Sequence, residues 1–354
     1  MNSAKPREVF SAEWPGGRLG ILGLLLSGLY FFGVLLRRLA YASGFMPVRR
    51  LPAPVISVGN LTVGGTGKTV CVEYLARLLL DWGVHPAVVS RGYGAYGKPD
   101  GGLVQDEAMV LSENVPGLPV VMDGNRARGG WEAIRRHGAD VILLDDAFSH
   151  LGIGRDLDIV LIDSSSAWES EDLLPLGRLR EPRWWLRRAQ VIILTRVDQA
   201  PSENIAHLRR EVRRIAPEAL QLEAVHEPWR VTSLLEDEEH EPAWLQGKRV
   251  YLLSAIASAS AFEKTVCSLG AQVTGHAVFR DHHQFTAEDV AQTIQKAGSS
   301  GAQFVLCTQK DAVKLVDLLY VHTPFYALVV RMRMLSGAEA FEKYLGRLVK
   351  AKTA

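Results

Sequence analysis

The sequence contains a short glycine-rich segment that ends in lysine and threonine. Residues 62–69 read Thr-Val-Gly-Gly-Thr-Gly-Lys-Thr and lie between an apolar stretch at 53–59 and an amphipathic stretch at 68–83. A buried strand, a glycine-rich loop and a helix start in this order predict a phosphate-binding loop, whose backbone N–H groups surround a phosphate. A plain glycine turn before a helix is the alternative, but the coincidence with Gly-Lys-Thr argues against it.

Two side chains of this loop have predicted chemical roles. Lys68 is expected to reach the β- and γ-phosphates of a nucleotide, and Thr69 to ligate a magnesium ion. Thr62 stands where the usual pattern has its first glycine, but the remaining glycines leave the backbone free to wrap round a phosphate. The residues predicted to bind the nucleotide are Thr62, Val63, Gly64, Gly65, Thr66, Gly67, Lys68 and Thr69.

Two adjacent aspartates, Asp145 and Asp146, end the apolar stretch at 138–146. Acidic residues at a strand end beside a phosphate loop normally hold Mg²⁺, directly or through water. Because successive strand residues point to opposite faces, a turn is needed for both carboxylates to face the site. One of them could instead cap a helix. With the loop, the pair predicts phosphoryl transfer or nucleoside triphosphate hydrolysis, without indicating the acceptor.

Apolar stretches alternate with helical patterns along the rest of the chain. The segments 53–59, 138–146, 156–163 and 189–198 are apolar on both faces, which is typical of strands in a parallel sheet covered by helices. The charged, proline-containing segment 233–242 is interpreted as a surface linker. Further strand and helix patterns after it predict a second, smaller α/β unit.

Length, charge and cysteine content restrict the class of protein. A chain of 354 residues suggests about two domains. Its net charge of +1 provides no nucleic-acid footprint, so no nucleic-acid partner is expected, and no obligate protein partner is inferred. Cys71, Cys267 and Cys307 are isolated, which excludes a disulfide framework or a Cys-x-x-Cys metal site and predicts plain core residues.

An uncharged apolar run at 19–36 precedes the predicted domains, with Arg18 before it and Arg37 and Arg38 after it. As a helix it would reach about 27 Å, just short of a hydrocarbon core of ~30 Å. A secretory signal with a cleavage site at 40–42 and a buried core helix are alternatives. Membrane attachment, either spanning or shallow, is favoured, because the cationic flanks suit anionic lipid headgroups.

Seven short blocks in order, over roughly residues 15–330, resemble the tetraacyldisaccharide 4'-kinase family, the lipid A 4'-kinases of Gram-negative bacteria. Only the first block is decisive alone, but seven in order are highly specific. The blocks are VGNLTVGGTGKT, SRGYG, DEAMVL, DDAFSHLGIGRDLDIVLID, LLPLGRLREP, DHHQF and TQKDAVKL.

The resemblance implies an ATP- and Mg²⁺-dependent kinase at the cytoplasmic face of the inner membrane. Its acceptor would be the 4'-hydroxyl of a tetraacylated glucosamine disaccharide 1-phosphate. Because that acceptor is a membrane lipid, an N-terminal anchor would hold the catalytic domain at the bilayer surface. The expected units are a membrane-associated segment at 1–50, a P-loop NTPase-type kinase domain at 51–235 with helices on both faces of a parallel sheet, and a smaller C-terminal α/β domain at 236–354 that contributes to the active site.

The resemblance also assigns catalytic and metal-binding roles. Asp106 falls on the family's catalytic aspartate, and His282 is implicated with it in activating the sugar hydroxyl. A sugar hydroxyl has a pKa far above 7 and needs such a base, with a second carboxylate to orient the imidazole. The predicted catalytic residues are Asp106, His282, Asp281 and Lys68. The predicted metal ligands are Thr69, Asp145, Asp146 and Glu107.

Acceptor or nucleotide phosphates would be bound by Arg91, Arg126, His150 and Arg180. Each arginine alone could equally belong to a surface ion pair, and the Asp-His-His block alone could be a polar loop before a helix. Trp184 and Trp185 stand beside Arg183, Arg187 and Arg188. The two tryptophans could form a patch at the membrane interface or a packed helix start.

The chain departs from the family pattern beside these reactive side chains. Gln105, Ala108, Ala147, Ser149 and Gln309 replace the family's glycine, proline, glycine, glutamine and glutamate, and 254–262 stands where the family has a glycine-rich loop. These departures leave two other functions open. The first is a GTPase-like switch, suggested by Thr-Arg-Val-Asp at 195–198, although this segment lacks the asparagine and lysine of a guanine-reading loop. The second is a degenerate kinase that acts as a membrane scaffold, suggested by the lost glycines.

Overall fold

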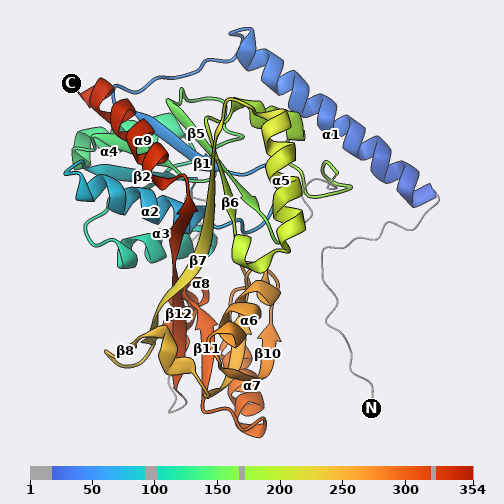
Figure 1. Cartoon of the computed structure of the whole chain (residues 1–354), viewed down its shortest axis with the longest axis vertical. Helices are drawn as coiled ribbons and strands as arrows, with labels where there is room; N and C mark the ends of the chain where they lie inside the picture. Colours follow the sequence, from blue (N-terminus) through green and yellow to red (C-terminus); the bar gives the residue numbers. More distant parts are fainter. Residues whose placement is uncertain (1–17, 92–101, 167–171, 320–323, 354) are drawn as a thin grey trace.

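The computed structural model describes residues 18–91, 102–166, 172–319 and 324–353. One twelve-stranded sheet runs through both halves of the molecule, in the order β10-β9-β11-β12-β7-β6-β5-β1-β4-β2-β3, with β8 paired to β7 (Figure 1). The strands are β1 Val55–Gly59, β2 Pro86–Ser90, β3 Val120–Met122, β4 Val141–Leu144, β5 Leu157–Asp163, β6 Val191–Thr195, β7 Leu220–Ser233, β8 Glu239–His240, β9 Arg249–Ser254, β10 Gln272–Val278, β11 Phe304–Thr308 and β12 Phe325–Ser336.

Helices cover this sheet on both faces of its larger half (Figure 1). The α-helices are α1 Arg18–Ala42, α2 Lys68–Asp81, α3 Gly102–Asn114, α4 Arg126–His137, α5 Ser202–Ile215, α6 Ala259–Ser268, α7 Ala287–Ser299, α8 Gln309–Leu315 and α9 Ala338–Thr353. Short 3₁₀ helices are η2 Arg183–Arg188, η3 Val197–Gln199, η4 Pro242–Leu245 and η5 Val316–Leu318.

The larger half is a parallel sheet whose strands β1, β2, β4 and β6 are buried at every position. Parallel pairing of β1 with β4 and β5 brings the carboxyl ends of these strands to one edge. The phosphate loop follows β1, and the paired aspartates follow β4. The predicted α/β class with a phosphate-loop sheet is confirmed, because uninterrupted apolar runs suit strands buried on both faces.

Two long strands, β7 and β12, join the halves. They pair antiparallel over most of their length and carry the sheet from β6 on one side to β11 on the other. The segment 233–242, interpreted from sequence as a surface linker, instead turns back so that β8 pairs with β7, and η4 begins at Pro242. The charged residues of this hairpin are accommodated because they are exposed or half-buried.

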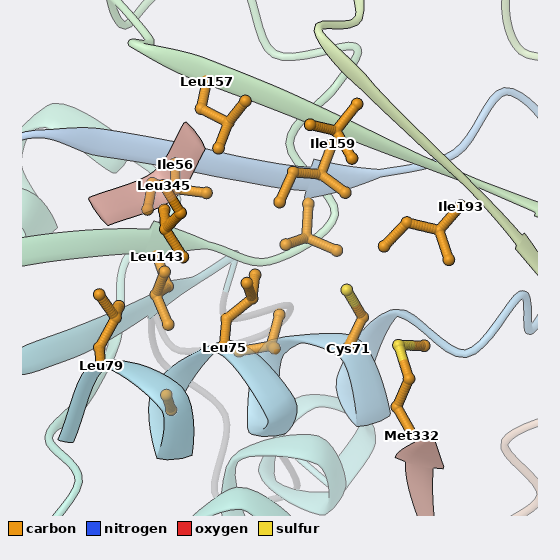
Figure 2. Packing of buried hydrophobic residues seen from close by; sticks show 14 of the residues in the cluster. Ile56, Cys71, Leu75, Leu79, Leu143, Leu157, Ile159, Ile193, Met332 and Leu345 are labelled. Carbon is orange, nitrogen blue, oxygen red and sulfur yellow. The ribbon is translucent and has the colours of Figure 1, made fainter. Parts of the chain in front are cut away.

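The largest core cluster packs α2 against the parallel strands, with Ile56, Leu75 and Leu143 fully buried (Figure 2). Helix α9 closes the same cluster through Leu345, although it is the last helix of the chain. We therefore propose that the smaller domain ends near β12 and that α9 belongs to the kinase half. Cys71 lies in this core as expected, whereas Cys267 is exposed at the end of α6, so the core prediction was wrong for it.

Helix α1 lies along the outside of the larger half (Figure 1). In its apolar window, Ile21–Ala42, only 6% of the residues are buried, so a core helix is ruled out. One side is fastened to the kinase half, where Ser27 Oγ donates to the Leu173 carbonyl at 3.1 Å and Tyr30 OH to the Arg180 carbonyl at 2.9 Å. Its opposite side is a continuous exposed apolar face.

Candidate active site

The phosphate loop has the backbone shape that its glycines predict. Gly64 and Gly67 adopt φ values of 113° and 92°, which are accessible to glycine and strained for other residues. Helix α2 begins at Lys68, so its N-terminal N–H groups face the loop. Lys68 Nζ donates to Asn60 Oδ1 at 3.3 Å and to the Gly64 carbonyl at 3.4 Å. The ammonium group is thereby held over the loop.

Asp145 and Asp146 lie in a tight turn after β4, as required for two neighbouring carboxylates to face one site. Asp146 has a φ of 47°, and its Oδ1 lies 3.9 Å from Lys68 Nζ. Burial would raise the pKa of Asp146, but the charge of Lys68 and the hydrogen bonds from Arg180 lower it to about 2. Asp146 is therefore an anion between two cations.

Asp145 has a different environment. It is buried, and within the described part of the chain its Oδ1 has no hydrogen-bond partner. Burial and the nearby charges of Glu107 and Asp146 raise the pKa of Asp145 to about 7. A carboxylate that is desolvated among other carboxylates in this way fits a site that receives a cation.

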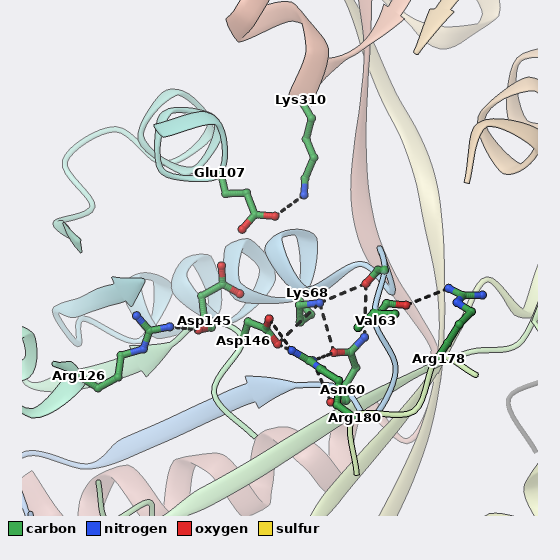
Figure 3. A network of polar contacts seen from close by, with 11 residues as sticks. Asn60, Val63, Lys68, Glu107, Arg126, Asp145, Asp146, Arg178, Arg180 and Lys310 are labelled. Carbon is green, nitrogen blue, oxygen red and sulfur yellow. Dashed lines mark hydrogen bonds and ion pairs between the residues drawn. The ribbon is translucent and has the colours of Figure 1, made fainter. Parts of the chain in front are cut away.

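Two arginines hold this acidic turn in place (Figure 3). Arg180 binds Asp146 through both ends of its guanidinium group, at 2.8 and 2.9 Å, and also contacts Asn60. Arg126, itself buried, donates to the Asp145 carbonyl at 2.8 Å. These two predicted substrate-binding arginines are thus already paired with the aspartate turn, and the bidentate geometry fixes its orientation.

The smaller half contributes to the same candidate site through α8. Lys310 of α8 points towards α3 and donates to Glu107 Oε1 at 2.5 Å (Figure 3). The charge of Lys310 outweighs burial and lowers the pKa of Glu107 to about 2. Asp106, the neighbour of Glu107, is 5% exposed, and its Oδ2 accepts no hydrogen bond from any described residue.

His282 and Asp281 lie in the loop after β10. His282 has a φ of 59°, and its Nε2 lies 3.9 Å from Asp281 Oδ1, an ion-pair separation without a hydrogen bond. The charges of Lys314 and, more weakly, His282 act to lower the pKa of Asp106, and those of Lys310 and, more weakly, His282 act to lower that of Glu107, so His282 lies near both carboxylates. Burial nevertheless leaves the pKa of Asp106 above its usual value.

His150 and Arg91 lie near Arg126, since their charges affect one another. Burial and the charges of Arg126, Arg37 and Arg155 lower the pKa of His150 to about 4, and Arg91 adds to this effect. His150 is therefore neutral at pH 7 and is surrounded by guanidinium groups. Such a cationic surrounding favours an anionic ligand.

A model of the family described as tetraacyldisaccharide-1-P 4'-kinase matches residues 19–350. The chain belongs to the tetraacyldisaccharide 4'-kinase family. It is 36% identical to the tetraacyldisaccharide 4'-kinase of Syntrophus aciditrophicus over 96% of both chains. It is 37% identical to that of Geobacter sulfurreducens, over 94% of this chain and 95% of the relative.

The fold is also similar to that of a solved kinase of this family. A structure of LpxK from Aquifex aeolicus, described as an "apo" form in complex with ATP, has a TM-score of 0.72 and 29% sequence identity. The similarity covers 94% of this chain and 99% of that chain. The protein is thus a tetraacyldisaccharide 4'-kinase of lipid A biosynthesis, from a family of ATP-binding kinases.

The Thr-Arg-Val-Asp segment of this tetraacyldisaccharide 4'-kinase, considered above as a guanine-reading loop, instead makes hydrogen bonds that support the phosphate loop. Thr195 Oγ1 donates to the Thr66 carbonyl at 3.1 Å, and Arg196 donates to the Gly65 carbonyl at 3.0 Å. Sequence reasoning missed this role, because these contacts join segments that are about 130 residues apart. It also missed Asn60 and Lys310, although both stand inside the blocks that carry the family resemblance.

The predicted interfacial tryptophans differ from each other. Trp184 is 50% exposed and contacts Phe31 of α1 edge-on, whereas Trp185 is buried beneath it. Only Trp184 is therefore available to an interface. No group of three or more His, Cys, Asp or Glu side chains arranged to hold a metal ion is found among the described residues, so the metal-ligand prediction for Thr69, Asp145, Asp146 and Glu107 rests on the buried carboxylate of Asp145.

Proposed function

We propose that Asp106 is the general base of the 4'-kinase reaction and that His282 assists it. Proton acceptance from the sugar 4'-hydroxyl requires a carboxylate oxygen that is not already engaged by the protein. The observation that carries this proposal is the buried Oδ2 of Asp106, which lacks a hydrogen-bond partner in the described structure. Asp281 would hold the His282 imidazole from the solvent side.

The phosphate loop would hold ATP at the opposite side of the site. Backbone N–H groups of residues 62–69 and the N-terminus of α2 would bind the β-phosphate, and the Lys68 ammonium the β- and γ-phosphates. In the loose transition state, negative charge on the transferred phosphoryl group would be stabilised by Lys68 and by the helix end. Closure of the smaller half over this site would exclude water and limit wasteful hydrolysis.

Mg²⁺ would be held by Thr69, Asp145 and Asp146, with Glu107 as a further carboxylate. The unsatisfied, buried Oδ1 of Asp145 fits such an ion, because a desolvated carboxylate is stabilised by a divalent charge. When bound, Mg²⁺ would neutralise negative charge on the phosphates of the nucleotide. Arg180 would keep the Asp146 carboxylate oriented throughout.

The acceptor would be a tetraacylated glucosamine disaccharide 1-phosphate that remains in the bilayer. Arg91, Arg126, Arg180 and the neutral His150 would bind its anionic and hydroxyl groups. Helix α1 would anchor the enzyme at the cytoplasmic face of the inner membrane, where ATP is available. The side of α1 that is hydrogen-bonded to the kinase half would fix the distance between the active site and the membrane. Its exposed apolar side would enter the lipid.

The assay that tests these assignments supplies purified protein with ATP, Mg²⁺ and the tetraacyl disaccharide 1-phosphate, and follows the added phosphate by mass. A 4'-deoxy acceptor is the matched control and should yield no phosphorylated lipid. Asp106→Asn is expected to lower kcat by about 10²- to 10⁴-fold, the usual contribution of a general base. Product formation at the wild-type rate by Asp106→Asn would overturn the assignment of the base.

A further inference from the structure

Lys314, in the last turn of α8, is a buried lysine at the boundary between the two halves. Its side chain is 6% exposed, and its ammonium group lies 3.8 Å from Asp106 Oδ2 and 3.0 Å from Asp311 Oδ1. It also donates to the His283 carbonyl at 3.4 Å and lies over the Phe285 ring. A buried ammonium is costly unless it is paired, so these contacts define where the side chain is held.

The partners of Lys314 lead to His282 along two routes. The first is direct, since His283 is the next residue along the chain. In the second, Asp311 Oδ2 accepts from the Ala255 N–H at 3.1 Å, and the Ala255 carbonyl accepts from the His282 N–H at 3.1 Å. The backbone of the His282 loop is therefore tied to α8 from both sides.

His282 needs such support because of its backbone conformation. Its φ of 59° lies in the left-handed region, which a histidine adopts only when its surroundings impose it. The ties to Asp311 and Lys314 are contacts that can impose it. Ala255 belongs to the loop that departs from the glycine-rich family pattern, and it acts here through its backbone alone.

The contact between Lys314 and Asp106 has a geometry that suits a base. At 3.8 Å the two groups form an ion pair without a hydrogen bond, so the carboxylate is attracted while its lone pairs stay available. Asp106 belongs to α3 of the larger half, and Lys314 to α8 of the smaller half. The lysine ammonium attracts the carboxylate across this boundary as a point charge. The carboxylate lone pair that would accept the proton of the substrate hydroxyl therefore stays free.

We propose that Lys314 is a positioning residue for phosphoryl transfer, which holds Asp106 and the His282 loop in one fixed arrangement across the boundary between the halves. This inference rests on the proposed role of Asp106 as the base. Lys314 is buried against Asp106, Asp311 and Phe285, so it would act through the two residues that it positions. Its loss should therefore affect the chemical step more than substrate binding.

The test compares Lys314→Met with Lys296→Met, a matched change at an exposed lysine of α7, in steady-state assays with ATP and lipid varied separately. Lys314→Met is expected to lower kcat by about 10²-fold, the effect of an ångström-scale displacement of a catalytic group, while both KM values stay close to wild type. Lys314→Arg, which keeps the charge, should recover part of kcat. Lys296→Met should behave as wild type.

A double variant separates this inference from the proposed function. Lys314→Met combined with Asp106→Asn should be no slower than Asp106→Asn alone, because the lysine acts through the aspartate. Multiplicative losses in the double variant would overturn the inference. So would a folded Lys314→Met enzyme with wild-type kcat when Asp106→Asn is inactive. Either result would leave Asp106 as the base. Wild-type kcat in Asp106→Asn would overturn both. If Lys314→Met does not fold, Lys314→Gln, which keeps a donor for the His283 carbonyl, takes its place with the same expected outcomes.

Discussion

The imidazole of His226, on strand β7, lies against the backbone of Gly67 in the phosphate loop, and a Cβ built on Gly67 would collide with the ring at Nε2. The strand that joins the two halves thus packs on the residue before Lys68. Gly67 is therefore required for two reasons. Any side chain would collide with His226, and the φ of 92° lies in the left-handed region that favours glycine. A single methyl group at this position would disturb both the loop and the connecting strand.

Gly67→Ala is expected to weaken ATP binding by about 10²-fold, since several charge-assisted hydrogen bonds to phosphate depend on the loop backbone. Gly83→Ala is the matched control, because Gly83 also has a positive φ, of 74°, but has open space around its Cβ position. Titration calorimetry with ATP measures both. Adding His226→Ala to Gly67→Ala should recover part of the affinity, and an unchanged affinity in Gly67→Ala would contradict the collision.

The same histidine predicts a pH dependence of folding stability. Burial, with the charge of Arg196, lowers the pKa of His226 to about 3, whereas the unfolded-state pKa is about 6.5. Between these values the unfolded chain binds a proton that the folded protein does not. Stability is therefore lost as the pH falls below 6.5, by at most about 1.4 kcal/mol per pH unit from this group.

His226→Gln should make the free energy of unfolding less steeply dependent on pH between 6.5 and 4.5, whatever its effect at pH 7. Urea denaturation across this range measures the slope. A change at the exposed His137 controls for the loss of one histidine. An identical slope in wild type and His226→Gln would show that the buried imidazole is not the source of the acid sensitivity.

Lys68→Ala is expected to abolish kinase activity with little change in folding. Among the described residues its ammonium group contacts the Gly64 carbonyl, Asn60 and, at 3.9 Å, Asp146, so it serves the site and no apolar core. Loss of one such group at a developing charge costs about 10²- to 10³-fold or more in kcat. Initial rates and a thermal melt of the same preparation test this. Turnover near wild type would mean that another cation neutralises the phosphates.

Asp106→Ala and His282→Ala should each lower kcat strongly and spare ATP affinity, because the phosphate loop and the Asp145–Asp146 turn stay intact. Their effects should be non-additive, since either change disables the same proton-accepting unit. With ATP and lipid both saturating, the double variant should therefore fall little below the slower single variant. Fully multiplicative losses would indicate that the two residues act independently.

The exposed side of α1 should determine membrane binding. Leu25 and Leu29 are 66% and 68% exposed, whereas Tyr30 faces the kinase half. Replacing both leucines by glutamate should reduce sedimentation with anionic vesicles by about 10²-fold or more, because a charge in hydrocarbon costs roughly 2–3 kcal/mol. ATP affinity should not change. Tyr30→Phe is the control that leaves the lipid face intact, and equal vesicle binding by all three proteins would place the attachment elsewhere.

Features that depend on neighbouring residues were predictable from the sequence. The phosphate loop before α2, the aspartate turn after β4 and the apolar α1 each follow from a local pattern of residue types, and the structure contains all three. Local patterns suffice here because backbone conformation and strand or helix periodicity are determined by residues a few positions apart. The family resemblance added the pairing of Asp106 with His282 as an expectation, without its geometry.

Other features were decided only by the tertiary structure. The bidentate contact of Arg180 with Asp146, the ion pair of Lys310 with Glu107 and the return of α9 to the first half all join segments far apart in the chain. No periodicity in the sequence indicates such contacts, because they depend on how β7 and β12 carry the sheet across the boundary. The sequence by itself therefore determined the local elements and indicated candidate groups for the chemistry, and the sheet topology decided which charges face one another.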